Sequence, residues 1–203
     1  MARKALDQDE LLVISRRCAA VFAEAGDSSP TVARLAEAAG MSQRSFYRYF
    51  PTKEECLRPL FDGGSRAFAD ALAAQPPGTA LADAMLRAFD LTYSTSSDEE
   101  ARALMAVVFA DAVLRRVWLQ ATYEITELLR PSVAALLGTP ADDLRTTAVC
   151  GQAALLNIVA LEHSIRDETP LADTARAAAA ALFGPLSQPR TATPHDAART
   201  TTK

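Results

Sequence analysis

Helix start and stop signals recur at short intervals along this chain, and they limit its possible folds more than any other feature. Asp7 and Glu10 form a capping box ahead of an apolar series at helical spacing, and Gly26 ends that series. Thr52 and Glu55 repeat the box farther on. The expected helices cover about residues 8–25, 31–39, 42–49, 53–74, 79–93, 97–110, 111–137, 140–166 and 170–183. The pattern therefore predicts an all-α fold of about nine helices.

Several expected helices contain residues that disfavour a continuous helix. Gly63 and Gly64 lie within the fourth segment, where we expect a bend or a break. Pro131 interrupts the long seventh segment. Pro140 and Pro170 each open a helix, because proline is tolerated in the first turn.

The composition agrees with a helical, folded protein of the cytoplasm. Of 203 residues, 49% are hydrophobic and only 8 are glycine, which argues against disorder and against a β-sandwich. Cys18, Cys56 and Cys150 form no CxxC pair, so we expect buried free thiols, no metal site and no cofactor. The N-terminus does not resemble a signal peptide, and no uninterrupted apolar run approaches the ~18 residues of a membrane span.

The net charge of −4 does not by itself indicate nucleic-acid binding, but the charges are unevenly distributed. Residues 38–53 contain Arg44, Arg48 and Lys53 and no acidic residue. Such a local basic patch can bind phosphates even on an acidic protein. A solvated helix face is the alternative interpretation.

The second and third expected helices are joined by a tight turn that contains Gly40. Their inward positions are apolar and comprise Val32, Leu35, Ala36, Phe46 and Phe50. This arrangement is typical of a helix-turn-helix, whose second helix enters the DNA major groove with its first residues at the base edges.

The second helix of the pair begins with side chains that suit DNA. Gln43 can pair with adenine and Arg44 with guanine. Further candidates for contacts to bases or phosphates are Thr31, Arg34, Ser45, Tyr47, Arg48 and Lys53. Lys53 opens the following helix, where its ammonium and nearby backbone N–H groups suit a phosphate. One of Tyr47 and Tyr49 could instead pack between helices.

The run from Thr31 to Glu55 carries the elements Ala-Gly-Met-Ser, Phe-Tyr-Arg-Tyr-Phe and Lys-Glu-Glu at fixed spacing. It resembles the DNA-binding domain of the TetR family of bacterial transcriptional regulators, and the likeness covers about residues 10–58. The resemblance implies an all-α homodimer with an N-terminal three-helix DNA-binding domain and a C-terminal helical ligand-binding and dimerisation domain. It implies DNA contacts from Thr31, Gln43, Arg44, Ser45, Tyr47, Arg48 and Lys53. Arg44, Ser45 and Cys56 depart from the usual residues of the family, and the first two suggest a different operator sequence.

The chain thus divides into three parts. Residues 1–52 form the helix-turn-helix domain, residues 53–184 form a helical effector-binding and dimerisation domain, and residues 185–203 form a tail that we expect to be disordered. Residues 79–184 contain no catalytic motif, and the adjacent Glu162 and His163 point apart on a helix. We therefore expect no enzymatic activity.

Large apolar side chains occupy inward faces of the expected C-terminal domain, which is otherwise rich in alanine. The candidate ligand-binding residues are Phe89, Tyr93, Met105, Phe109, Trp118, Thr122 and Asn157. Large apolar side chains on inward helix faces can equally belong to the hydrophobic core without binding a ligand. Asn157 is the most specific candidate because a buried amide needs a partner. A contact across a dimer interface is its other interpretation.

The last two expected helices have the character of a dimer face. Small or smooth residues follow one side of each, namely Gly151, Ala153, Ala154, Leu171, Ala175, Ala178 and Leu182. Two such helices from each protomer would form a four-helix contact, although a contact within one protomer fits the same pattern.

These observations favour a cytoplasmic repressor that binds a near-palindromic operator on double-stranded DNA as a homodimer, away from membranes. A small, hydrophobic effector would release it. One alternative is a DNA-binding regulator without an effector, whose interior is filled by side chains. Another is a helical interaction or enzyme domain with an incidental helix-turn-helix.

Overall fold

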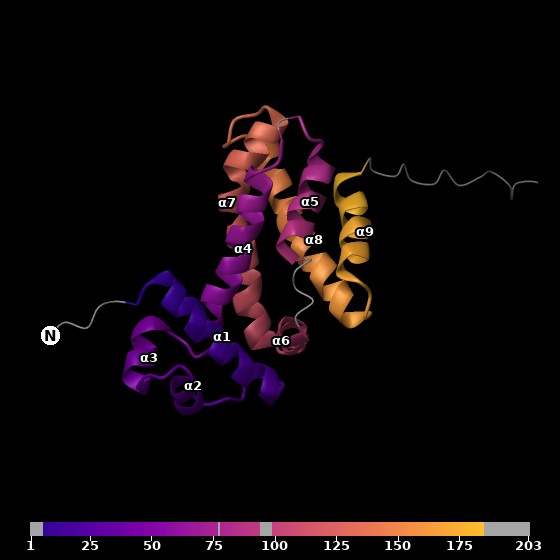
Figure 1. Ribbon diagram of the computed structural model, residues 1–203. Coiled ribbons are helices and arrows are strands. Elements are labelled where there is room, and N and C mark those ends of the chain that lie inside the picture. The colour runs from indigo at the N-terminus through magenta and orange to yellow at the C-terminus, as the bar shows by residue number, and fades with distance from the viewer. Residues whose placement is uncertain (1–5, 77, 94–98, 185–203) are drawn as a thin grey trace, which may run out of the picture.

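The computed structural model describes residues 6–76, 78–93 and 99–184, and within these ranges the chain forms nine α-helices, one 3₁₀ helix and no strand (Figure 1). The elements are α1 (Gln8–Ala25), α2 (Val32–Ala38), α3 (Gln43–Tyr49), η1 (Glu54–Leu57), α4 (Arg58–Ala73), α5 (Leu81–Tyr93), α6 (Glu99–Ala110), α7 (Ala112–Leu137), α8 (Leu144–Arg166) and α9 (Leu171–Phe183). The predicted all-α fold is confirmed. The predicted tail lies outside the described residues.

Local hydrogen bonds define the starts of the first three helices, and both predicted ends of α1 are confirmed. Asp7 and Glu10 form the capping box of α1, and Gly26 ends that helix with a left-handed φ of 77°. Thr31 and Ser42 are the N-caps of α2 and α3, where each side chain accepts a backbone N–H of the first turn. These caps place the two short helices on either side of a four-residue turn.

The fourth predicted helix differs from the structure in two respects. Residues 54–57 form η1 without a side-chain cap, so Thr52 and Glu55 do not form a capping box, and α4 begins only at Arg58. The helix α4 then continues through Gly63 and Gly64 without a break. Packing against α1, α5 and α7 explains this continuity, because tertiary contacts outweigh the low helix propensity of glycine.

Two prolines also behave differently from the prediction. Pro131 does not interrupt α7. Because proline has no N–H, the Glu127 carbonyl loses its helical hydrogen bond. Both residues are exposed, so water can replace that bond. Pro140 does not open α8. It belongs to a preceding turn in which its carbonyl accepts from the Asp143 N–H at 3.2 Å, and Asp143 is the N-cap of the helix.

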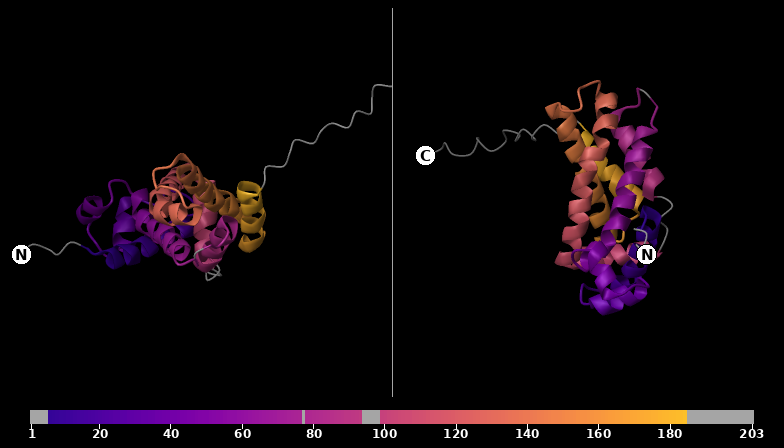
Figure 2. Two further views of the ribbon diagram at one scale, coloured as in Figure 1. Left: turned by 90° about the horizontal axis from the view of Figure 1, so that it is seen from above. Right: turned by 90° about the vertical axis from the view of Figure 1, so that its left-hand side faces the viewer.

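The molecule has an upright helical bundle with the N-terminal helices at one end (Figures 1 and 2). Helices α4, α5, α7, α8 and α9 form the bundle, and α1, α2, α3 and α6 lie at its base. One core cluster joins Phe22 of α1, Leu35 of α2 and Phe46 of α3 to Val108 of α6 and Leu114 of α7. Helices α1, α2 and α3 therefore share a core with the first turns of α7.

By length and composition alone, α8 could cross a membrane, although its uninterrupted apolar runs are short. In the structure it packs against α7 and α9, and its buried side chains include Cys150, Ala153 and Leu156. It is thus built as a core helix of the bundle. All three cysteines are free and buried, as predicted.

Candidate DNA-binding face and interior cavity

A single buried side chain anchors α3. Phe46 is fully buried, and its ring packs against Phe50 at 5.0 Å between centroids. Gln43, Arg44 and Arg48 are exposed, and the side chains of Gln43 and Arg44 form no hydrogen bond or ion pair with another described residue. The first turn of α3 is therefore free to contact a partner molecule.

Two other candidates contribute to the helix ends. The Thr31 hydroxyl accepts the Arg34 N–H at 3.3 Å, and the Ser42 hydroxyl donates to that of Ser45 at 3.0 Å. The Arg34 guanidinium lies 2.6 Å from Glu24, but both side chains are more than half exposed, so this pair restrains Arg34 weakly.

The two tyrosines of α3 have different environments. Tyr47 is 54% exposed, whereas Tyr49 is half-buried and its hydroxyl accepts the Leu6 N–H at 3.3 Å. The Arg48 guanidinium lies 4.8 Å from the centre of the Tyr49 ring and donates to its hydroxyl. Tyr49 is therefore the one that packs between helices, and it also holds Arg48 in place.

Lys53 faces the protein rather than an open surface. Its ammonium donates to the carbonyl of Ser28 and, at 3.0 Å, to that of Pro30, and Glu54 lies 3.8 Å away. The side chain is 27% exposed. It also precedes η1 rather than opening a long helix. These contacts tie the loop between α1 and α2 to η1.

A cavity of about 240 Å³ lies between the base helices and the bundle. Its wall comes from α4, α6, α7, α8 and α9 and from the end of α5, and consists of Leu60, Phe61, Gly64, Tyr93, Ala101, Arg102, Leu104, Met105, Trp118, Leu161, Ser164, Ile165 and Leu171. Most of these side chains are apolar. The cavity exceeds the roughly 150 Å³ that suffices for benzene in an engineered site.

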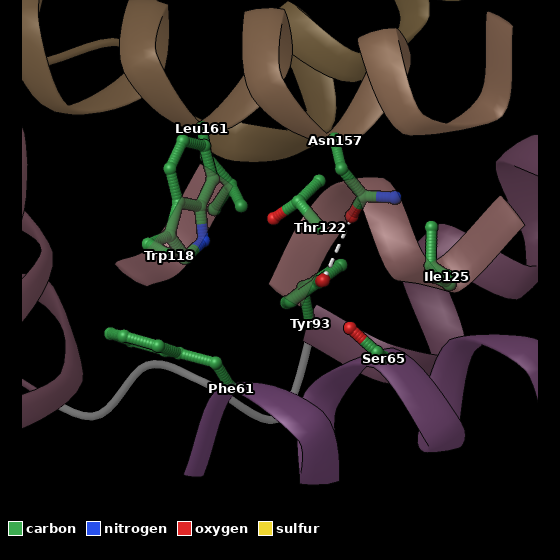
Figure 3. A pocket seen from close by; sticks show the side chains of 8 residues that line it. All are labelled: Phe61, Ser65, Tyr93, Trp118, Thr122, Ile125, Asn157 and Leu161. Atoms are coloured by element: carbon green, nitrogen blue, oxygen red, sulfur yellow. Dashed lines mark hydrogen bonds between the residues drawn. The ribbon is translucent and has the colours of Figure 1, made fainter. Parts of the chain in front are cut away.

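A smaller void of about 20 Å³ adjoins this cavity and shares four of its wall residues (Figure 3). Ser65, Thr122, Ile125 and Asn157 complete its lining. The Tyr93 hydroxyl donates to Asn157 Oδ1 at 2.8 Å, and the Asn157 amide donates to the Ala153 carbonyl at 3.3 Å. Asn157, 2% exposed, thus has its partners within the protomer. Burial raises the pKa of Tyr93, so its hydroxyl remains protonated at neutral pH.

The predicted ligand residues fall into two groups. Tyr93, Met105, Trp118, Thr122 and Asn157 line the cavity or its small extension. Phe89 and Phe109 do not, because each packs behind a lining ring: Phe89 lies 4.6 Å from Tyr93, and Phe109 lies 4.9 Å from Trp118. The prediction omitted the α4 wall, although Phe61 and Ser65 recur at i and i+4. It also omitted Arg102, which gives no apolar signal.

Asp111 connects α7, which forms part of the cavity wall, to the loop before α2. It is the N-cap of α7, and its Oδ1 accepts the Val113 and Leu114 N–H groups at 2.8 and 3.1 Å. Its Oδ2 accepts the Ser28 N–H at 2.9 Å. Burial raises the pKa of Asp111, but the hydrogen bonds from Ser28, Leu114 and Val113 outweigh it and lower the pKa to about 2. The carboxylate therefore remains charged at neutral pH.

Part of the predicted dimer face is buried within a single protomer, between α8 and α9. Ala153, Ala154, Ala175 and Ala178 are buried, and α8 packs directly on α9. The outward side of α8 exposes other apolar residues instead; Leu155 is 47% exposed.

Residues 17–60 match the family model described as bacterial regulatory proteins, tetR family. None of the curated proteins matches the sequence. Among solved structures, the chain is similar to the TetR family transcriptional regulator PfmR from Thermus thermophilus, with 18% identity, a TM-score of 0.46 and coverage of 86% of this chain and 99% of that chain. The matched segment contains α2, α3 and their turn. Residues 17–60 thus carry the helix-turn-helix of the tetR family of bacterial regulatory proteins, which makes the chain a DNA-binding regulator.

Proposed function

We propose that this regulator is a cytoplasmic, ligand-responsive repressor that binds a near-palindromic operator as a homodimer. A small, largely hydrophobic effector would enter the cavity and release the DNA. The observation that carries this proposal is the apolar cavity beside the helices that share a core with α3. An open cavity favours an effector over the alternative of a regulator whose interior is filled.

The free side chains at the start of α3 support base recognition. Gln43 and Arg44 are exposed in its first turn, where a recognition helix meets base edges. Arg48 and Tyr47 lie one turn farther on and would contact the backbone, with Thr31, Arg34 and Ser45 beside them. Lys53 would act by holding the Ser28 and Pro30 carbonyls, and so the start of α2.

A continuous set of contacts would couple the cavity to the DNA. Trp118 lines the cavity from α7, Asp111 caps that helix, and Ser28 binds Asp111 just before α2 begins. A displacement of the first turns of α7 would therefore shift α2 and α3. The effector must bind the non-DNA-binding conformation more tightly, because equal affinity for both states shifts nothing.

The outward faces of α8 and α9 would form the dimer contact. They expose small or apolar residues, which are Ala148, Leu155, Ala177, Ala180 and Ala181. A two-fold axis through this contact would relate two recognition helices, and their spacing should be on the order of 34–36 Å.

Selection of bound DNA from a random pool tests this proposal most directly. We expect enriched sites with two inverted half-sites about one helical turn apart. Analytical ultracentrifugation of the free protein should give a dimer. Enrichment of a single asymmetric half-site, or a stable monomer at micromolar concentration, would contradict the proposed homodimeric repressor.

A further inference from the structure

One charged side chain borders the cavity and its small extension among the described residues, and it is Arg102 of α6. Arg102 is exposed at the cavity rim, where its Nη2 donates to the Ser164 carbonyl at 3.4 Å. No described carboxylate lies within ion-pair distance of this guanidinium, and neither lining contains Asp or Glu. The rim of the cavity therefore carries a positive charge with no ion-pair partner among the described residues, next to an apolar interior.

We infer that the effector is an amphipathic monocarboxylic acid, whose apolar body fills the cavity and whose carboxylate pairs with Arg102. This inference rests on the proposed effector response. The planar guanidinium can donate two parallel hydrogen bonds to a carboxylate, and such charge-assisted pairs are stronger than neutral ones. A neutral ligand of the same shape would leave the guanidinium with only the Ser164 carbonyl and water as partners.

The other end of the cavity does not suit a charged group. Its polar atoms are neutral, and the Tyr93 hydroxyl and Asn157 amide already bind each other (Figure 3). The void beside Ser65 and Thr122 measures about 20 Å³, which holds one water molecule but no carboxylate. The acid group is therefore assigned to the rim and the apolar end to the interior.

The cavity volume limits the size of the apolar body. A benzene molecule occupies an engineered cavity of about 150 Å³, which corresponds to roughly 25 Å³ for each of its carbon atoms. On this scale the 240 Å³ cavity accepts about ten non-hydrogen atoms. Octanoate has this size, and octanamide is its neutral counterpart of nearly identical shape.

The single tryptophan of the chain provides the measurement, because Trp118 lines both voids. Titration of the dimer with each probe, followed by Trp118 emission, should give at least tenfold tighter binding of octanoate than of octanamide. In Arg102→Gln this preference should fall to about twofold or less, with the affinity for octanamide unchanged. Arg102→Lys should keep part of the preference. Arg116→Gln removes an exposed arginine of α7 outside the cavity and should leave the preference intact.

Operator release measured on the same samples separates the two proposals. Release by octanoate that Arg102→Gln weakens at least tenfold would support the inference. If octanamide binds and releases the operator as well as octanoate does, the carboxylate assignment is wrong and the effector response stands. A preference that survives in Arg102→Gln would also overturn the assignment. Failure of both probes to bind would also overturn the carboxylate assignment. The operator affinity measured in the same assay reports on DNA binding independently.

Discussion

Asp111 should control operator affinity separately from its role as a helix cap. Its two carboxylate oxygens have different partners: Oδ1 caps α7, and Oδ2 accepts the Ser28 N–H in the loop before α2. Asp111→Asn can keep the capping oxygen, but its amide would place a donor against the Ser28 donor. Asp111→Ser keeps a cap and leaves the Ser28 N–H without its carboxylate partner.

The expected magnitudes differ between stability and DNA binding. Asparagine and serine are both good N-caps, so loss of the cap contributes only a few tenths of a kcal/mol in these variants, against about 0.5–2 kcal/mol for alanine. Loss of a hydrogen bond to a charged group costs about 1.5–3 kcal/mol when its partner is left unsatisfied. Water can reach this half-exposed site, so we expect the low end of that range, and a roughly tenfold loss of operator affinity.

Fluorescence anisotropy with labelled operator, together with urea unfolding, measures both quantities. The matched control is Asp143→Ser, which alters the N-cap of α8, where Asp143 accepts the Arg145 N–H and has no contact with the α1–α2 loop. The control should keep wild-type operator affinity. Equal operator affinities for Asp111→Asn, Asp143→Ser and wild type would refute the connection through Ser28.

The pH dependence gives an independent check of the same carboxylate. Its folded pKa of about 2 lies below the ordinary aspartate value of 3.8, so it stabilises the folded state above the unfolded pKa. This contribution is lost as pH falls from about 4 toward 2. The difference in unfolding free energy between wild type and Asp111→Ser should therefore be constant from about pH 5 to 8 and should shrink below about pH 4.

Three further predictions concern the DNA and dimer faces. Arg44→Ala should cost about 1–3 kcal/mol and relax preference at one base position in a site library, whereas a uniform loss across sites would make Arg44 a phosphate contact. Arg48→Ala should lower the slope of log affinity against log salt by about two per dimer, while Lys53→Gln should weaken binding with that slope unchanged, because its ammonium is held by loop carbonyls. Leu155→Glu should shift the protein toward monomer in sedimentation, whereas Leu128→Glu on the exposed side of α7 should not.

Local chemistry made the N-terminal part of the fold predictable. Asp7, Thr31 and Ser42 each cap a helix through a bond to the residue three positions away, so neighbouring sequence is sufficient information. The same reasoning was wrong at Thr52 and at Pro140. At Thr52 the 3₁₀ turn η1, which packs against α1 and α7, delays the start of α4. At Pro140 the determining contacts are local, because its carbonyl accepts from Asp143, whose side chain caps α8.

The cavity shows the corresponding limit for a binding site. Apolar periodicity identified Tyr93, Met105 and Trp118, because an inward stripe is visible in the sequence. It could not separate Phe89 and Phe109, which lie behind the wall, from the residues that form it. That distinction depends on how six helices pack around one space. Local sequence also gave no sign that two loop carbonyls would hold the ammonium of Lys53, whose side chain remains partly exposed.

The continuity of α4 changes how an effector would act on the DNA-binding helices. A bend at Gly63 and Gly64 would have let α4 yield there, but the helix passes through both residues without a break. The alternative connection is rigid: Val108, Leu114 and Val117 belong to the same core as Phe22 and Leu35. Well-packed cores respond to strain by shifting between discrete arrangements rather than by gradual deformation. A ligand that displaces Trp118 would therefore move the first turns of α7 and the helix-turn-helix together, and the Asp111 contact with Ser28 would transmit that movement to the start of α2.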